Sequence, residues 1–391
     1  MEKLTAICPI CHADKTDLLL KISQVPIHCN ILFTSQEAAI NTPRGDISLT
    51  SCKNCGHIFN ADFQTERMDY EGEYENSLHF SPRFQAYAEQ LAGDLVEKYD
   101  LKKKKLLEIG SGNGDFLKIM CQLGDNSGIG FDPSYVAGES ESQNGNVQII
   151  RDFFTDKYAS LPADFIISRH VLEHIDKPAE FLDMLREIIA ERLETIVFFE
   201  VPNAAWTIEE LGIWDLIYEH FSYFTRHSLE YGFRQAGFVI LNTKERFNRQ
   251  FLTIEAQASL DDYYQTSSDD LQKINRITKQ FAQQYYQTKI EWHQKLDQMA
   301  QDGETGIVWG AGSKGVTFMN VMKPADTILN VVDINPRKQG KFIAGTGQEI
   351  ISPSMLKQVS PDVVIIMNAN YFEEISKQMH DLSVSAQVVV A

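Results

Sequence analysis

The chain has 391 residues, of which 43% are hydrophobic and 23% are charged, so it is long enough for two or three globular domains. Its 54 acidic and 36 basic residues give a net charge of -18, which argues against a nucleic-acid partner because such a surface repels phosphate backbones. No apolar run approaches the roughly 20 residues that span a bilayer, and the first residues lack the pattern of a signal peptide, so we expect a cytoplasmic protein with no membrane partner.

Four of the six cysteines form two Cys-x-x-Cys pairs, Cys8 with Cys11 and Cys52 with Cys55. Each such turn presents two thiolates on one side of a tight loop, and four thiolates are the ligands of a tetrahedral structural zinc. The alternative, a redox-active pair, usually follows a strand and opens a helix, and that context is missing here. Since cysteine would fill all four coordination positions, residues 1–70 are predicted to be a zinc-binding module in which the metal is structural.

Residues 71–258 are predicted to form an α/β domain with a doubly wound, parallel sheet. Apolar strands alternate here with amphipathic helices, which is typical of parallel strands joined by helical crossovers. A last pair of strands, with a turn at Asn248 and Arg249, is expected to close the sheet in antiparallel fashion. The expected helices cover residues 81–99, 177–189 and 226–235, and the expected strands begin at residue 106 and then cover 127–132, 147–151, 165–168, 196–201, 238–246 and 251–258.

Residues 259–391 are predicted to hold a helical linker and a second Rossmann-like domain. A glutamine-rich amphipathic helix over 271–300 comes first. A second strand–glycine loop–helix pattern follows, with a helix that ends at Met322 and strands at 306–309, 330–333, 363–367 and 388–390. Two Rossmann-like halves in one chain predict a ligand-binding cleft between them.

The most informative segment is the strand end at Glu108 and the glycine-rich loop that runs on to Gly114. Glycines in such a loop let the backbone approach a ligand closely and adopt positive φ angles. A nicotinamide site would want a third glycine where Asp115 stands, and an acid at Glu108 would repel a pyrophosphate but suits a sulfonium donor that carries an amino group. The next two strands also end in acids, Asp132 for the ribose hydroxyls and Asp152 for the adenine amino group.

This order of parts resembles the class I methyltransferase fold, whose methyl donor is S-adenosylmethionine (SAM). The resemblance places the donor against the glycine loop, the two strand-end acids and the start of the segment after the fourth strand. The predicted donor-binding residues are Glu108, Gly110, Ser111, Gly112, Asn113, Gly114, Asp132, Pro133, Asp152, Phe153, Arg169 and His170.

Two histidine-containing segments follow the fourth and fifth strands, where side chains of an open α/β sheet face the ligand crevice. In the first, Arg169 to Ile175, a structural role at a helix start remains an equal alternative for each histidine. In the second, Tyr218 to Phe224, a histidine beside an acid and two phenols could take a proton from an activated carbon. The predicted catalytic residues are His220, Tyr218, Glu219, His174 and Tyr223.

The complete set of motifs resembles the three-domain sugar C-methyltransferases, which join a zinc-binding N-terminal domain to a methyltransferase domain and a C-methyltransferase C-terminal domain. The resemblance covers nearly the whole chain and includes the loop Gly310 to Gly315 and the segment Asp333 to Gly340. It implies methylation of the carbon next to the ketone of a nucleotide-linked deoxyketosugar, with His220 as the general base.

The same resemblance places the sugar nucleotide between the C-terminal and central domains. The glycine loop with Lys314 could bind phosphate at a helix N-terminus, although a Rossmann-like domain that only packs would carry a similar loop. The predicted substrate-binding residues are Lys314, Ser313, Asn335, Arg337, Asn370 and Tyr371.

Two segments depart from the pattern of the sugar enzymes. Residues 247–251 contain no glycine where a glycine-rich stretch is expected, and residues 74–81 are not the expected tyrosine-rich lead-in. The alternative is therefore an enzyme of the same architecture that methylates carbon, oxygen or nitrogen of a non-sugar small molecule. Because the two Rossmann-like halves could close a site within one chain, we expect a monomer.

Overall fold

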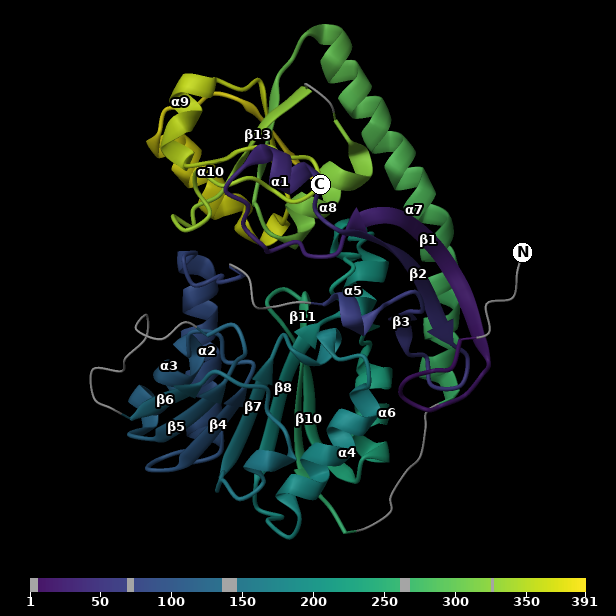
Figure 1. The fold of residues 1–391 in the computed structure, drawn as a ribbon, viewed down its shortest axis with the longest axis vertical. Coiled ribbons are helices and arrows are strands. Elements are labelled where there is room, and N and C mark those ends of the chain that lie inside the picture. Colours follow the sequence, from purple (N-terminus) through teal and green to yellow (C-terminus); the bar gives the residue numbers. More distant parts are fainter. Residues whose placement is uncertain (1–5, 69–73, 136–145, 261–267, 325–326) are drawn as a thin grey trace.

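The computed structural model describes residues 6–68, 74–135, 146–260, 268–324 and 327–391, so the predicted boundary between residues 70 and 71 falls outside the described part. The strands form a four-stranded, a seven-stranded and a five-stranded sheet. Figure 1 shows the seven-stranded sheet in the lower half of the molecule and the five-stranded sheet in the upper half. Within the described ranges, no helix combines the length and the apolar character that crossing a membrane requires.

The four-stranded sheet is built mainly from the N-terminal residues, in the order β1-β2-β3-β9. Its last strand comes from the acceptor-side segment of the methyltransferase region, where Tyr223 pairs with Ile58. The sequence does not predict the long first strand, because polar residues and two register shifts interrupt its alternation. The strands are β1 (Thr16–Pro26), β2 (Arg44–Cys52), β3 (Ile58–Asn60) and β9 (Ser222–Tyr223).

The seven-stranded sheet has the order β10-β11-β8-β7-β4-β5-β6, with β11 antiparallel to both of its neighbours and the other pairs parallel. This is the doubly wound sheet with an antiparallel closing pair that the sequence predicts. Chain order reverses at β4, and ligands of open α/β sheets bind at such a switch point. The strands are β4 (Lys105–Ile109), β5 (Ser127–Phe131), β6 (Val147–Ile150), β7 (Phe165–Arg169), β8 (Ile196–Pro202), β10 (Phe238–Arg246) and β11 (Phe251–Ala258).

Helices cover both faces of this sheet because alternate apolar residues of its strands point to opposite sides. Leu106 joins a core with α2 and α3, whereas Leu107 joins a core with α4 and α6. The second core also contains three of the four paired cysteines, so the N-terminal module packs on that face. The helices are α2 (Pro82–Lys98), α3 (Asp115–Gly124), α4 (Pro178–Ile189), α5 (Ala204–Glu209) and α6 (Arg226–Gln235).

The five-stranded sheet is parallel throughout, in the order β14-β13-β12-β15-β16, and confirms the second Rossmann-like half. The long helix α7 (Ser268–Asp302) leads into it and runs beside the strands of the N-terminal sheet in Figure 1. Apolar side chains on one face of α7, among them Phe281, Trp292 and Leu296, enter a core shared with both sheets. The other elements are α1 (Gln36–Ile40), β12 (Gly306–Trp309), α8 (Ser313–Met322), β13 (Ile328–Val332), β14 (Ile350–Ile351), α9 (Leu356–Val359), β15 (Val363–Ile366), α10 (Phe372–Asp381) and β16 (Gln387–Val390).

Candidate methyl-transfer site and cysteine cluster

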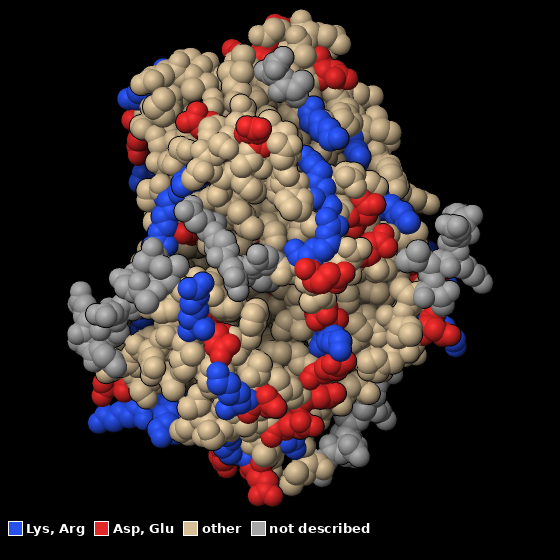
Figure 2. Space-filling model, viewed as in Figure 1, with Lys and Arg blue, Asp and Glu red and all other residues tan. Residues whose placement is uncertain are grey.

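A cavity of about 1140 Å³ lies between the carboxyl ends of the central strands and those of the C-terminal sheet. Both glycine loops, the segment after β7 and residues 74–81 line it. On the face of the molecule shown in Figure 2, acidic and basic side chains are interspersed, and the described residues form no broad basic patch there. The cavity is therefore the candidate site.

The loop between β4 and α3 is shaped by three glycines in the left-handed region, Gly110, Gly112 and Gly114, with φ of 69°, 52° and 73°. A Cβ on Gly110 would lie 2.1 Å from a methyl carbon of Val171, so no larger residue fits. The N–H of Gly112 donates to Asp132 Oδ2 at 2.7 Å, which ties the loop to the end of β5. Gly110 and Gly112 line the cavity, while Gly114 lies behind it at the start of α3.

The strand-end acids lie where the sequence predicts them, at the cavity wall. Asp152 accepts hydrogen bonds from Tyr158 at 2.6 Å and from Lys157 at 2.9 Å. Glu108 is only 3% exposed, and its Oε2 has no hydrogen-bond partner among the described residues. Burial raises the pKa of Glu108 to about 8. A buried carboxylate oxygen without a partner fits a cationic ligand, as the sulfonium and ammonium groups of SAM would be.

Arg169 and His170 meet a single buried carboxylate at the end of β8. Arg169 donates to Glu200 Oε1 at 2.7 Å and 3.0 Å, and His170 Nε2 lies 3.2 Å from the same oxygen. Burial alone would lower the pKa of His170, but Glu173 and Glu200 outweigh it and raise the pKa to about 9. His170 is therefore an imidazolium at neutral pH, held in a left-handed backbone conformation with φ of 55°.

On the acceptor side the structure brings His174 and His220 together. Their rings lie edge to face, with centroids 5.0 Å apart, and both line the cavity. His174 Nδ1 lies 2.9 Å from the carbonyl oxygen of Glu219. Burial, followed by the neighbouring His174, lowers the pKa of His220 to about 3, so His220 is neutral and can accept a proton.

The other three predicted catalytic side chains do not line the cavity. Tyr218 accepts a hydrogen bond from the N–H of Gln64 at 3.0 Å, and Tyr223 donates to the carbonyl of Ile217 at 3.0 Å. Glu219 is fully buried and accepts from the N–H of Cys29. Because β9 joins the N-terminal sheet, these side chains pack against that sheet and do not face the cavity. In this arrangement the three residues do not reach an acceptor in the cavity, contrary to the prediction.

Five of the six predicted substrate-binding residues line the C-terminal side of the cavity: Ser313, Lys314, Asn335, Arg337 and Tyr371. Lys314 pairs with Asp215, and Glu75 accepts hydrogen bonds from Asn335 and Arg337, each at 3.1 Å. The sixth, Asn370, lies behind the wall, where its amide donates to Gln250 at 2.7 Å. This contact ties the turn between β10 and β11 to the loop after β15.

Several residues that line the cavity were not among the predicted site residues, among them His79, Glu173 and Gln250. Glu173 had a usable signal, because it stands between two histidines of a segment already singled out. Gln250 and His79 lie in the two segments that depart from the pattern of the sugar enzymes. Only the packing of residues 74–81 across the cavity brings His79 to its wall.

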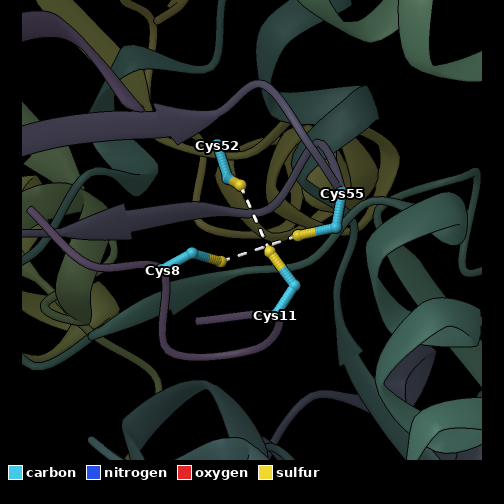
Figure 3. Close-up of side chains that lie close together, drawn as sticks. All are labelled: Cys8, Cys11, Cys52 and Cys55. Carbon is cyan, nitrogen blue, oxygen red and sulfur yellow. Dashed lines mark hydrogen bonds between the residues drawn. The ribbon is translucent and has the colours of Figure 1, made fainter. Parts of the chain in front are cut away.

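The four paired cysteines converge on one point, as Figure 3 shows. The Sγ atoms of Cys8 and Cys55 are 3.6 Å apart and those of Cys11 and Cys52 are 3.5 Å apart, too far for a disulfide. A zinc tetrahedron with bonds of about 2.3 Å has edges of about 3.8 Å, so the cluster has close to the dimensions of a zinc site.

Comparison with known proteins agrees with this geometry. Residues 83–243 match the model of a methyltransferase domain, and residues 252–391 match that of a C-methyltransferase C-terminal domain. The C-methyltransferase NovU of Streptomyces niveus is 22% identical over 390 residues, covering 94% of this chain and 90% of its own.

Similar solved structures include an S-adenosylmethionine-dependent methyltransferase of Listeria monocytogenes described as provisional in function, at 13% identity and a TM-score of 0.34, which covers 44% of this chain and 99% of its own. A second is the magnesium protoporphyrin IX methyltransferase of Synechocystis PCC 6803 with bound SAH, at 14% identity and a TM-score of 0.34 over 49% of this chain and 91% of its own.

The sheet order, the glycine loop and the first domain match together define a class I SAM-dependent methyltransferase. Within that class, the methyltransferase domain is followed by a C-methyltransferase C-terminal domain, and the chain is similar to a C-methyltransferase over nearly its whole length.

Proposed function

We propose that this enzyme methylates the carbon next to the ketone of a nucleotide-linked keto-deoxysugar. The observation that carries the proposal is the shared cavity. It joins the donor loop, a half-buried histidine pair, and a second glycine loop with basic side chains.

The C-terminal wall offers the acceptor an anion site. The N-terminus of α8 begins at Ser313, directly after the loop, and Lys314 and Arg337 border it. A helix N-terminus and basic side chains together favour phosphate. Asp215 and Glu75 balance the two basic groups when no acceptor is bound.

The donor side is served by Glu108, Asp132 and Asp152, which are placed for the cationic, ribose and adenine groups in turn. SAM, when bound, supplies an electrophilic methyl group. His220 takes the proton from the carbon next to the ketone, and the C–H electron pair becomes the enolate. The enolate carbon then attacks the methyl group, and the electron pair of the broken C–S bond goes to sulfur. Both halves of the cavity come from one chain, which supports an active monomer.

We also propose that Cys8, Cys11, Cys52 and Cys55 hold a structural zinc. Three of the sulfurs belong to the core beneath α4 and α6, so the metal would anchor the N-terminal sheet to the methyltransferase region. One zinc per chain by elemental analysis, lost in Cys52→Ser together with thermal stability, is the expected result. A full complement of zinc in that variant would contradict it.

Deuterium wash-in tests the proposed reaction. The enzyme with bound SAH is incubated in D₂O with dTDP- or UDP-linked 4-keto-6-deoxyhexoses, and exchange next to the ketone is followed by NMR. We expect exchange that His220→Ala abolishes. Exchange retained in that variant would exclude His220 as the base.

The second candidate is a non-sugar acceptor, and the turn between β10 and β11 favours it. This turn presents Gln250 and Phe251 to the cavity instead of a glycine-rich stretch. A thermal-shift screen separates the two candidates, because the sugar-nucleotide proposal requires stabilisation by at least one nucleoside diphosphate, whereas a non-sugar acceptor requires none.

A further inference from the structure

Glu173 is the buried acid of the cavity that the proposed reaction has not used. It lies in the short 3₁₀ turn Leu172–His174 just after β7, is 1% exposed and lines the cavity. Its Oε1 lies 3.7 Å from His170 Nδ1, and its Oε2 has no hydrogen-bond partner among the described residues. Burial opposes its ionisation, but His170 and then His174 hold the pKa of Glu173 below its ordinary value. An ionised carboxylate with a free oxygen is costly to bury, so a role beyond packing is expected.

Glu173 lies beside the histidine pair. One carboxylate oxygen of Glu173 and one ring nitrogen each of His174 and His220 lie within 4.8 Å of one another. The carbonyl of Glu219 can only accept a hydrogen bond, so His174 Nδ1 carries a proton and donates it to that carbonyl. The titratable groups that act on His220 are Glu173, His170 and His174 from the segment after β7, and Glu219 from the loop before β9.

The two acids near His220 differ in where they lie. Each has one carboxylate oxygen without a hydrogen-bond partner among the described residues. Glu219 accepts from the N–H of Cys29, lies 3.6 Å from His28 and does not line the cavity, whereas Glu173 does line it. A base that starts neutral and buried becomes a buried cation when it takes a proton, and such a cation needs a nearby anion.

We propose that Glu173 is a positioning residue whose carboxylate stabilises the imidazolium formed on His220 during proton abstraction. The inference rests on the proposed function. In the step, the C–H bond next to the ketone breaks, its electron pair stays in the enolate, and the proton bonds to the ring-nitrogen lone pair of His220. Glu173 receives no proton. It supplies fixed negative charge that the product of the step needs and the reactant does not.

The test compares Glu173→Gln with Glu255→Gln in the zinc-loaded, SAH-bound enzyme, by the wash-in assay with the same ketosugar probes. Glu255 is an equally buried acid, 3% exposed, that bonds Lys98 and Tyr99 away from the cavity. For Glu173→Gln we expect exchange about 10²-fold slower at saturating probe, with KM for the probe and Kd for SAH within about twofold of wild type. Loss of the anion lowers the pKa of His220, so the acid limb of the rate profile should move to lower pH. Glu255→Gln should exchange like wild type.

The possible results separate a failure of the role of Glu173 from a failure of the proposed function. Exchange by wild type together with an unchanged rate and pH profile in Glu173→Gln overturns the role of Glu173 alone. Exchange that requires an added divalent cation also overturns it, because the three side chains would then be metal ligands. Absence of exchange in wild type with every probe removes the proposed function and this inference with it. If Glu173→Gln no longer binds SAH, the exchange rate of Glu173→Asp is measured in its place. A rate within about tenfold of wild type supports a requirement for charge, and a rate as low as that of His220→Ala overturns it.

Discussion

The two glycine loops of this protein are each tied by a backbone N–H to an aspartate at the end of the next strand, but they differ in backbone and in chemistry. In the central half the N–H of Gly112 donates to Asp132 at 2.7 Å, and in the C-terminal half the N–H of Ala311 donates to Asp333 at 2.9 Å. One residue before each strand ends, the central half buries Glu108, whereas the C-terminal half buries Val308.

Other differences between the two halves also change the charge that each half presents to the cavity. Beyond its loop the C-terminal half carries Lys314, which faces the cavity. At the end of the adjacent strand, the central half has the charged Arg169 and His170, and the C-terminal half has the neutral amides of Asn368 and Asn370. Two strand–loop–helix units of the same kind can therefore favour a cation on one side of a cavity and an anion on the other, because a few side chains decide the charge.

The largest expected effect comes from the packing of the loops. Gly110→Ala places a Cβ 2.1 Å from Val171 at a φ of 69°, so we expect about 3 kcal/mol lower stability and loss of measurable SAM binding. Gly310→Ala has its nearest contact at 3.8 Å, from Met367, but its φ of 117° also strains an alanine, so we expect some loss of stability and unchanged SAM affinity. Urea unfolding measures the stability and calorimetry the affinity. Equal losses of SAM affinity in the two variants would contradict the proposed division between the loops.

Next in size is the charge of Glu108. In the empty site its pKa is about 8, so below that pH a proton must leave when the cationic donor binds. SAM affinity should therefore rise with pH from about 6 to 8 and level off above. Glu108→Gln should flatten this profile and weaken SAM by about 10–100-fold, with a smaller loss for SAH, which lacks the sulfonium charge. Calorimetry at several pH values checks it, and equal losses for SAM and SAH would count against the charge argument.

His170 should make stability depend on pH in the alkaline range. Its pKa in the folded protein is raised to about 9 from the ordinary histidine value of about 6.5, so the stabilisation is complete below about 6.5 and is lost as pH rises through 9. We expect about 1–3 kcal/mol of this loss to disappear in His170→Gln. Denaturant unfolding between pH 6 and 10 measures this pH dependence of the stability. The same slope in variant and wild type would assign the loss to another group.

The smallest effect is expected at Lys314. Lys314→Gln should weaken dTDP or UDP by about tenfold and leave SAH unaffected, since one charge-assisted contact is lost. High salt should narrow the difference between variant and wild type. A comparable loss of SAH affinity would place Lys314 on the donor side and break the comparison of the two halves.

Sequence patterns predicted most strands of the two Rossmann-like halves and several of their helices, but not α5, α9, α10 or β14. The strands β10 and β11 and the helix α6 have the expected bounds, because alternation and helical periodicity are local signals. The placement of acids such as Asp132 at strand ends was equally local. The strand β1 was not predicted, since its polar residues and register shifts break the alternation.

The fate of the Tyr218 to Phe224 segment shows what local patterns cannot supply. Its residue types suggested one catalytic cluster, yet pairing of β9 with β3 turns Tyr218 and Tyr223 into the packing and leaves His220 at the cavity. That choice depends on residues near position 58, far away in the chain.

By itself, the sequence determined two glycine loops with their following helices, two cysteine pairs and the succession of strands along the chain, because each depends on neighbouring residues. Only the tertiary structure decided which side chains share the cavity. It brought Glu173 beside His220, His79 to the wall, and Glu75 onto Arg337, since these contacts join separate elements whose relative positions are set by the packing of the whole molecule.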